Sequence, residues 1–238
     1  MYTVGTILIL PAILFALYAQ FKVMSAFDTY SQIAGTRGMT ARDLARRLLD
    51  DNGCRDVKVA AVHGHLSDHY DPRTKTVSLS DDVYNSTSLA ALGIAAHEVG
   101  HAIQHHERYA PLMLRQVVIH STGFLNKALL PLIIIGLIGS IFVTAVSPAM
   151  WLYIILGFCV IYCVSFLVNL ITLPTELNAS NRAKKLLRKG NYLIDENERE
   201  AVSRVLGAAA MTYVASLVVS LAYMLRFLGL LLTIMDRR

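Results

Sequence analysis

The sequence contains one cluster of side chains with clear chemical potential, the pentapeptide His97-Glu98-Val99-Gly100-His101. Residues four apart in a helix share a face, so the imidazoles of His97 and His101 can bind one zinc ion together. Glu98 lies beside that metal and can act as a general base toward a water molecule there. The flanking residues 90–96 and 102–103 are apolar or glycine, and an unpaired carboxylate in such surroundings costs about several kcal/mol. The pattern therefore predicts a catalytic metal site on a buried helix.

Two histidines do not complete a catalytic zinc site, which usually has three protein ligands and one open position. The metzincin extension is absent, because Gln104 and Glu107 stand where that motif has Gly and His. His105 lies on the same rough face, but about 12 Å along a straight helix from the first histidine. We expect Glu176 to be the third ligand, because it is the first charge after a 48-residue uncharged run. The alternative is a carboxylate that only favours a helix N-terminus.

The composition is that of an integral membrane protein. Hydrophobic residues make up 55% of the chain and charged residues only 16%, against about 25% charged in soluble domains. Residues 1–21, 128–175 and 205–225 contain no Asp, Glu, Lys or Arg. A span needs about 20 apolar residues, so we expect four transmembrane helices, at 3–21, 128–147, 150–172 and 206–234. The first lacks the basic residues of a signal peptide, which favours a retained anchor, and the last is either continuous or bent at Arg226.

Hydrophilic segments alternate with these spans, and their charges predict the topology. Of the 22 Lys and Arg residues, 12 lie in 22–127 and seven in 182–204. By the positive-inside rule both segments face the cytoplasm, so we expect a multi-pass plasma-membrane protein with its site on the cytoplasmic side. The expected division is an anchor at 1–21, a zinc-site region at 22–127, a transmembrane hairpin at 128–173, a helix with the third ligand at 174–204, and a C-terminal transmembrane helix at 205–238.

The zinc-site region is expected to be a small α+β unit in an otherwise mainly α-helical protein. Thr40 and Asp43 begin a helix that Asn52-Gly53 ends. Two strands follow, at 57–62 and 76–80, with a turn at 69–73. Residues 86–88 offer N-caps for the motif helix, which extends to about residue 106. Pro174 is expected to start the helix that carries Glu176.

Substrate binding is less clearly marked in the sequence. A peptidase needs an oxyanion donor, and His69 and Tyr70 are candidates if their turn faces the zinc, the alternative being that they are ordinary turn residues. A protein or peptide substrate, membrane-proximal or unfolded, could add as a strand to the 57–80 pair. The lipid bilayer is the other expected partner. No motif or basic–aromatic pattern indicates nucleic acid, and nothing indicates the oligomeric state.

Four segments resemble the YugP-type membrane zinc metallopeptidases: 19–21, 64–72, 95–105 and 173–180. The layout is more distantly similar to HtpX-type membrane proteases, which place two spans between the H-E-x-x-H motif and a glutamate ligand. This resemblance implies a Zn²⁺ peptidase in which His97, His101 and Glu176 bind the metal and Glu98 is the base. The sequence departs from the HtpX pattern at Ser180, where that family has an Asp that orients a zinc histidine. Ser180 or Asn178 is then expected to take that supporting role.

Two other classes of function compete with a peptidase. ZIP-type zinc transporters also have H-E-x-x-H in a membrane helix, but they have about eight spans and several ionisable residues along the pathway. Site-2-type intramembrane proteolysis needs an Asp within a span, and residues 128–175 contain none. A catalytically inactive membrane scaffold is the remaining alternative, and the intact Glu98 argues against it.

Overall fold

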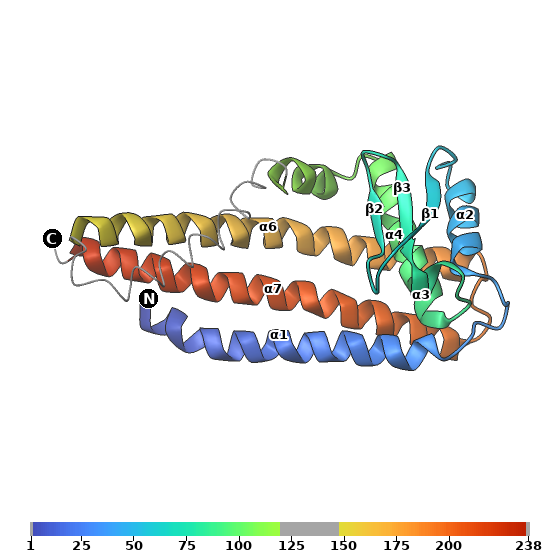
Figure 1. Cartoon of the computed structure of the whole chain (residues 1–238), viewed down its shortest axis with the longest axis horizontal. Coiled ribbons are helices and arrows are strands. Elements are labelled where there is room, and N and C mark those ends of the chain that lie inside the picture. Colours follow the sequence, from blue (N-terminus) through green and yellow to red (C-terminus); the bar gives the residue numbers. More distant parts are fainter. Residues whose placement is uncertain (1, 120–147, 237–238) are drawn as a thin grey trace. The chain divides into compact units, whose positions relative to one another are not determined.

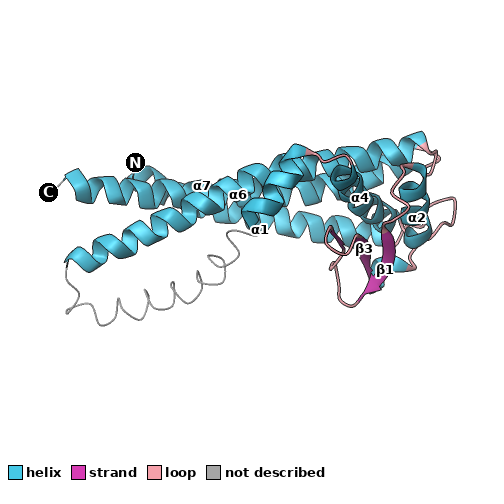
Figure 2. Ribbon diagram, turned by 90° about the horizontal axis from the view of Figure 1, so that it is seen from above, coloured by secondary structure: helices cyan, strands magenta, loops and turns pink. Residues whose placement is uncertain are grey.

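The computed structural model describes residues 2–119 and 148–236, and helices account for most of them (Figures 1 and 2). The elements are α1 (Tyr2–Ser31), α2 (Ala41–Asp51), β1 (Lys58–Val62), β2 (His69–Asp71), β3 (Thr76–Ser80), α3 (Asp81–Tyr84), α4 (Leu89–His106), a helix at Ala110–Ile119, α6 (Pro148–Lys189) and α7 (Glu196–Asp236). Residue contacts divide the chain into two compact units. Among described residues, the apolar unit comprises 2–17, 114–119, 148–172 and 213–236, and the site unit comprises 18–113 and 173–212.

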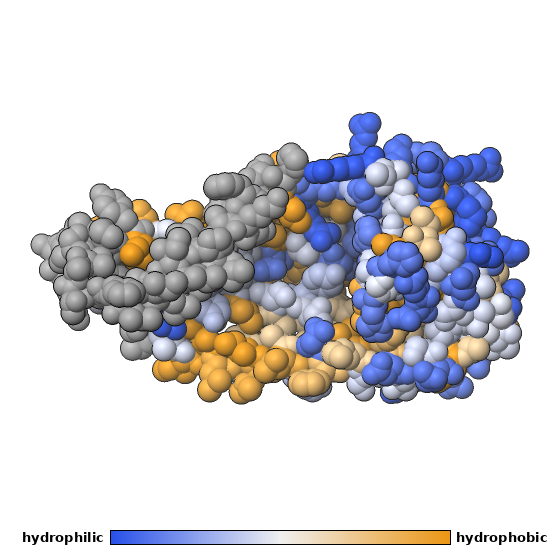
Figure 3. All heavy atoms as spheres, in the orientation of Figure 1, coloured by the Kyte–Doolittle hydropathy of each residue, from blue (hydrophilic) through white to orange (hydrophobic). Residues whose placement is uncertain are grey.

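The apolar unit has the character of a membrane domain. Helices α1, α6 and α7 each contain a stretch long and apolar enough to cross a bilayer, and the visible atoms of the first half of α1 are mostly hydrophobic (Figure 3). Aromatic rings stack between α6 and α7, with Tyr162 4.8 Å from Tyr223 and 5.1 Å from Phe227 between ring centroids. The predicted spans at 3–21, 150–172 and 206–234 fall in these helices. The span predicted at 128–147 lies outside the described residues, so four spans remain a prediction.

Two helices run further than the sequence predicts. Pro174 does not start a helix but lies inside the 42-residue α6, although a proline removes one backbone hydrogen bond there. The apolar segment before the proline and the polar segment after it continue as one helix, a tolerance for proline that is common in membrane helices. Helix α7 is likewise one helix through Arg226. The expected domain boundaries at 173/174 and 204/205 therefore fall within helices, and the five-part division itself stays a prediction.

The small sheet has three strands rather than the expected two. Residues 69–71 form β2 rather than part of a turn, and the order is β1-β3-β2. Strand β2 pairs antiparallel with β3, whereas β1 pairs with β3 in parallel. Residues 72–75 form the tight turn between β2 and β3, and the φ of 50° at Lys75 reverses the chain direction. A three-residue strand is too short to show the alternation by which strands are recognised in a sequence.

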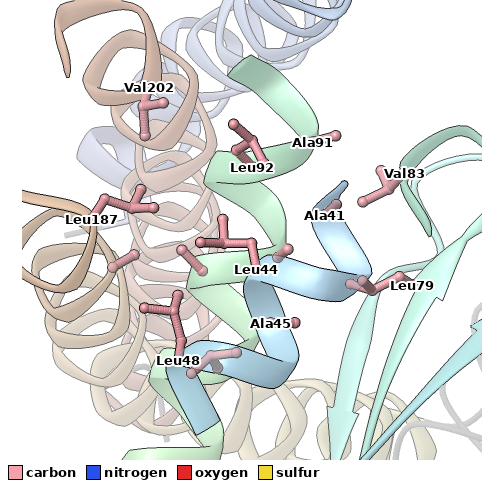
Figure 4. Packing of buried hydrophobic residues seen from close by; sticks show 14 of the residues in the cluster. Ala41, Leu44, Ala45, Leu48, Leu79, Val83, Ala91, Leu92, Leu187 and Val202 are labelled. Carbon is pink, nitrogen blue, oxygen red and sulfur yellow. The ribbon is translucent and has the colours of Figure 1, made fainter. Parts of the chain in front are cut away.

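The core of the site unit surrounds α4. Helix α2 begins as predicted, with Thr40 as the N-cap whose side chain accepts a hydrogen bond from the Asp43 amide. Its apolar face, with Leu44 and Leu48, points toward α4, and Leu187 and Val202 approach the same cluster from α6 and α7 (Figure 4). Burying a leucine side chain of this kind contributes about 1.5–3 kcal/mol. The motif helix is therefore held on several sides before any metal contributes.

Candidate metal centre

Helix α4 carries the H-E-x-x-H motif and is fixed at both ends. Its N-cap is Ser88, whose hydroxyl accepts a hydrogen bond from the Ala91 amide at 3.2 Å. The helix ends at His106, as the sequence predicts. Glu98 and His101 are buried, with 7% and 8% of their surface exposed. The motif therefore sits in a helix whose polar groups need partners from neighbouring elements.

Helix α6 approaches α4 closely at the motif. A Cβ atom at Gly100 would lie 2.8 Å from the backbone oxygen of Ala179, so the two backbones meet where α4 lacks a side chain. Glu176 precedes that contact by almost one turn of α6 and is 2% exposed. The absence of a side chain at Gly100 thus lets α6 bring its carboxylate to the two histidines.

His97, His101 and Glu176 form a compact group of potential metal ligands. One nitrogen of each imidazole and one carboxylate oxygen lie within 4.8 Å of one another. Glu176 Oε2 is 3.2 Å from His97 Nε2 and 3.3 Å from His101 Nε2. The structure brings together the three residues that the sequence nominated, from segments 75 positions or more apart.

The donor set fits zinc. Zinc bonds to His nitrogen and carboxylate oxygen measure about 2.0–2.2 Å, and at a tetrahedral angle they place neighbouring ligand atoms about 3.4 Å apart. The two separations of 3.2 and 3.3 Å match that edge. Three ligands also leave the fourth position that a catalytic site requires.

The other nitrogen of each imidazole is occupied by a polar partner. His101 Nδ1 lies 3.0 Å from Gln104 Oε1, and His97 Nδ1 lies 3.1 Å from Ser180 Oγ. Such contacts orient a histidine and direct its free Nε2 to a metal. Ser180 therefore occupies the place expected for it beside a histidine, whereas Asn178 reaches the site through Gln104, whose Nε2 lies 2.9 Å from Asn178 Oδ1.

The electrostatics of the site favour a bound cation. Burial alone would lower the pKa of His101, but its hydrogen bond with Glu176 and the charges of Glu98 and Glu176 outweigh burial and raise that pKa. Glu98 and Glu176 thus place two carboxylates near a buried imidazole. A divalent cation compensates such a group of carboxylates better than a proton does.

The contacts of His69 and Tyr70 lead away from this cluster. His69 Nδ1 lies 2.8 Å from the Ser67 carbonyl oxygen, and the Tyr70 hydroxyl lies 2.8 Å from Nδ1 of His105. His105, which is too far along the helix to be a ligand, thus has Tyr70 of β2 as its partner. An oxyanion role for His69 or Tyr70 stays a prediction.

Gln104 and Arg182 are site residues that the motif analysis missed. In the sequence, Gln104 excludes a metzincin motif and Arg182 contributes to the predicted topology, and neither is predicted to support the site. Their spacing in the sequence could have identified them. Gln104 follows His101 by three positions and Arg182 follows Asn178 by four, and side chains with this spacing are neighbours on a helix. What the sequence does not display is that these two pairs meet.

A group of two histidines and a glutamate that could hold zinc, in a mostly helical chain with helices of membrane-spanning length, is compatible with a membrane zinc peptidase, and comparison with known proteins identifies the family. Residues 5–232 match the family described as "Putative neutral zinc metallopeptidase", and the chain belongs to this family, whose cofactor is Zn²⁺. It is 41% identical to "Putative membrane protease YugP" of Bacillus subtilis (strain 168) over 227 residues, which cover 94% of this chain and 95% of that protein. No solved structure matches the chain.

Proposed function

We propose that this protein is a membrane-embedded zinc endopeptidase in which His97, His101 and Glu176 hold the metal and Glu98 is the general base. One observation carries the proposal: the ligand atoms of the three residues lie within 4.8 Å of one another, with the Glu176 oxygen at tetrahedral spacing from each imidazole, while both Nδ1 atoms have other partners. An H-E-x-x-H motif completed by a downstream Glu is the gluzincin-like arrangement. Membership of the zinc metallopeptidase family supports the reaction class.

The chemistry is hydrolysis of a peptide bond by water. Zinc, when bound, supplies a Lewis acid that polarises the scissile carbonyl and acidifies water. Glu98 takes a proton from the attacking water as the C–O bond forms, and it delivers that proton to the amine as the C–N bond breaks. Glu98 is buried and its charge raises the pKa of His101, so its carboxylate lies near the ligand cluster.

The decisive experiment compares wild type with Glu98→Gln, both purified in detergent, for zinc content and for cleavage of unfolded casein. We expect both proteins to bind about one zinc and only the wild type to cleave. Cleavage that survives Glu98→Gln would contradict the base assignment. Zinc uptake into liposomes without cleavage by either protein would favour a transporter, and zinc binding with neither activity would favour an inactive scaffold.

The third ligand is tested by Glu176→Ala, with Glu198→Ala as a matched control. Glu198 is also a buried carboxylate of the site unit, but it accepts a hydrogen bond from Thr36 at 2.7 Å rather than pairing with the motif histidines. We expect the first variant to lose zinc and the second to retain most of it. Unchanged zinc occupancy in Glu176→Ala would refute this ligand.

The site is proposed to act at the cytoplasmic face of a multi-pass plasma-membrane protein, on membrane-proximal or unfolded protein segments. The Lys and Arg distribution supports this orientation. The test uses a variant whose three cysteines (Cys54, Cys159 and Cys163) are replaced by Ser and in which Lys184→Cys adds one label site. A membrane-impermeant maleimide should label inverted vesicles but not intact cells, and the reverse pattern would overturn the orientation.

A further inference from the structure

Gln104 is a fully buried amide, with 0% of its surface exposed. Leaving one such polar group unsatisfied costs about 1–3 kcal/mol. Its Nε2 donates to the backbone oxygen of Thr175 at 2.8 Å and to Asn178 Oδ1 at 2.9 Å, while its Oε1 faces His101 Nδ1 at 3.0 Å. The amide is therefore satisfied on both ends, and its orientation matters for the histidine.

Neighbouring polar groups determine which way the Gln104 amide is turned. The Arg182 guanidinium can only donate, and its Nε lies 2.7 Å from Asn178 Oδ1, so Asn178 must present its oxygen there. That oxygen can only accept, and the Thr175 carbonyl can only accept as well. Gln104 must therefore turn its NH₂ group toward both, which leaves its oxygen facing His101.

An oxygen acceptor at 3.0 Å requires that His101 carry its proton on Nδ1. In a neutral imidazole the other nitrogen, Nε2, then has a free lone pair, and Nε2 is the atom that lies 3.3 Å from Glu176 Oε2. His97 is not constrained in this way, because its partner Ser180 has a hydroxyl that can donate or accept. Of the two candidate ligand histidines, His101 alone has its tautomer determined by an amide.

The far end of this chain of contacts is itself anchored. Arg182 pairs with Glu107 at 2.7 Å, and its guanidinium lies 5.9 Å from the ring centroid of Tyr109. We propose that Gln104 is a positioning residue that locks His101 as its Nδ1–H tautomer, ready to bind zinc through Nε2, and that Asn178 and Arg182 set its orientation. This inference rests on the proposed function, because it assumes that His101 is a metal ligand.

The test compares two substitutions at position 104 by zinc affinity, measured by competition with a chromogenic chelator in detergent. Gln104→Glu keeps an oxygen acceptor for His101, whereas Gln104→Met keeps the volume but removes the acceptor. We expect about a 10- to 100-fold loss of affinity in Gln104→Met and a loss of only a few-fold in Gln104→Glu. A role in packing alone predicts the opposite order, because methionine fills the space without burying a charge, and that order would overturn the proposal.

A control removes a partly buried hydrogen bond elsewhere in the site unit. Thr36 Oγ1 donates to Glu198 Oε1 at 2.7 Å, and Thr36→Val should leave zinc affinity within a few-fold of wild type. An equal loss in Thr36→Val and Gln104→Met would mean that general destabilisation explains both, and would overturn the positioning role.

A direct reading of the tautomer does not depend on any variant folding. In zinc-loaded wild type labelled with ¹⁵N-histidine, His101 should show a protonated Nδ1 and a zinc-bound Nε2, and zinc bound at Nδ1 would overturn the proposal. His101→Ala separates the two failures. If that variant retains zinc, the proposed ligand set is wrong, whereas loss of zinc there with full affinity in Gln104→Met would refute only the positioning role.

Discussion

Gly100→Ala is predicted to weaken zinc binding although position 100 is not a ligand. The added Cβ would lie 2.8 Å from the Ala179 oxygen, and ordinary contact begins at 3.4 Å, so relief requires a retreat of about 0.6 Å. The atom in the way is backbone, so helix α6 must move as a whole. Metal–ligand distances tolerate only about 0.2 Å, and Glu176 moves with α6.

The size of the effect follows from the cost of overpacking. An extra carbon in a close-packed contact costs about 1–3 kcal/mol, while replacing a helical glycine with alanine returns about 0.5–1 kcal/mol. The net loss of unfolding free energy is therefore about 0–2.5 kcal/mol. Zinc binding, however, requires α6 to return to its wild-type position, so it must overcome the full overpacking cost of about 1–3 kcal/mol. Because about 1.4 kcal/mol corresponds to a tenfold change in affinity, zinc affinity falls about 5- to 150-fold.

Gly93→Ala is the matched control, because Gly93 lies on the same helix and gains the same helix propensity. Its Cβ would lie 3.1 Å from Cγ1 of Val202, a side chain rather than backbone. Chelator competition should give wild-type zinc affinity for Gly93→Ala and a clear loss for Gly100→Ala, with far-UV circular dichroism checking that both fold. Equal zinc affinities in the two variants would show that the α4–α6 approach does not set the ligand geometry.

Three further outcomes can be measured. Stripping zinc with a chelator should lower the melting temperature of the wild type, since zinc at 100 times its dissociation constant contributes about 2.7 kcal/mol, while His97→Ala should not respond. Burial raises the pKa of Asp68 above its ordinary 3.8, despite the hydrogen bonds from Ser80. The folded state therefore holds that proton more tightly, so the unfolding free energy should fall as pH rises from 3.8 through the raised pKa. In denaturant titrations at several pH values, the unfolding free energy of Asp68→Asn should not show this decrease. Burial also raises the pKa of the Cys54 thiol, so iodoacetamide should modify Cys54 in the folded protein far more slowly than in denaturant, and equal rates would contradict its burial.

The parts of the structure that the sequence predicted are those with local signals. The ends of α2 and α4 follow from Thr40 and Ser88, whose side chains cap their own helices. Glu176 was found because a long uncharged run makes the first charge after it conspicuous. Each inference needed only residues within a few positions of one another, or a gap in composition.

The parts that the sequence did not reveal depend on contacts between distant segments. The short strand β2 exists because His69–Asp71 pairs with β3, and the parallel pairing of β1 with β3 leaves no local pattern. The sequence predicts a helix start at Pro174, because proline is common there, but the helix on both sides is continuous. The strands thus depend on tertiary pairing, and the continuous helix departs from the usual local preference of proline.

Gln104 shows why a motif search does not find the residues that support the ligands of a metal site. On α4 the polar residues His97, His101 and Gln104 form one row. On α6, Glu176 and Ser180 contact the histidines of that row, and Thr175 and Asn178 contact Gln104. Neither row is unusual by itself, because each could be the polar stripe of an ordinary helix. The two rows match donor to acceptor only when Gly100 allows the backbones to approach. The packing contact and the metal site are thus one feature of the α4–α6 pair, so a substitution that leaves every ligand in place can still weaken the site.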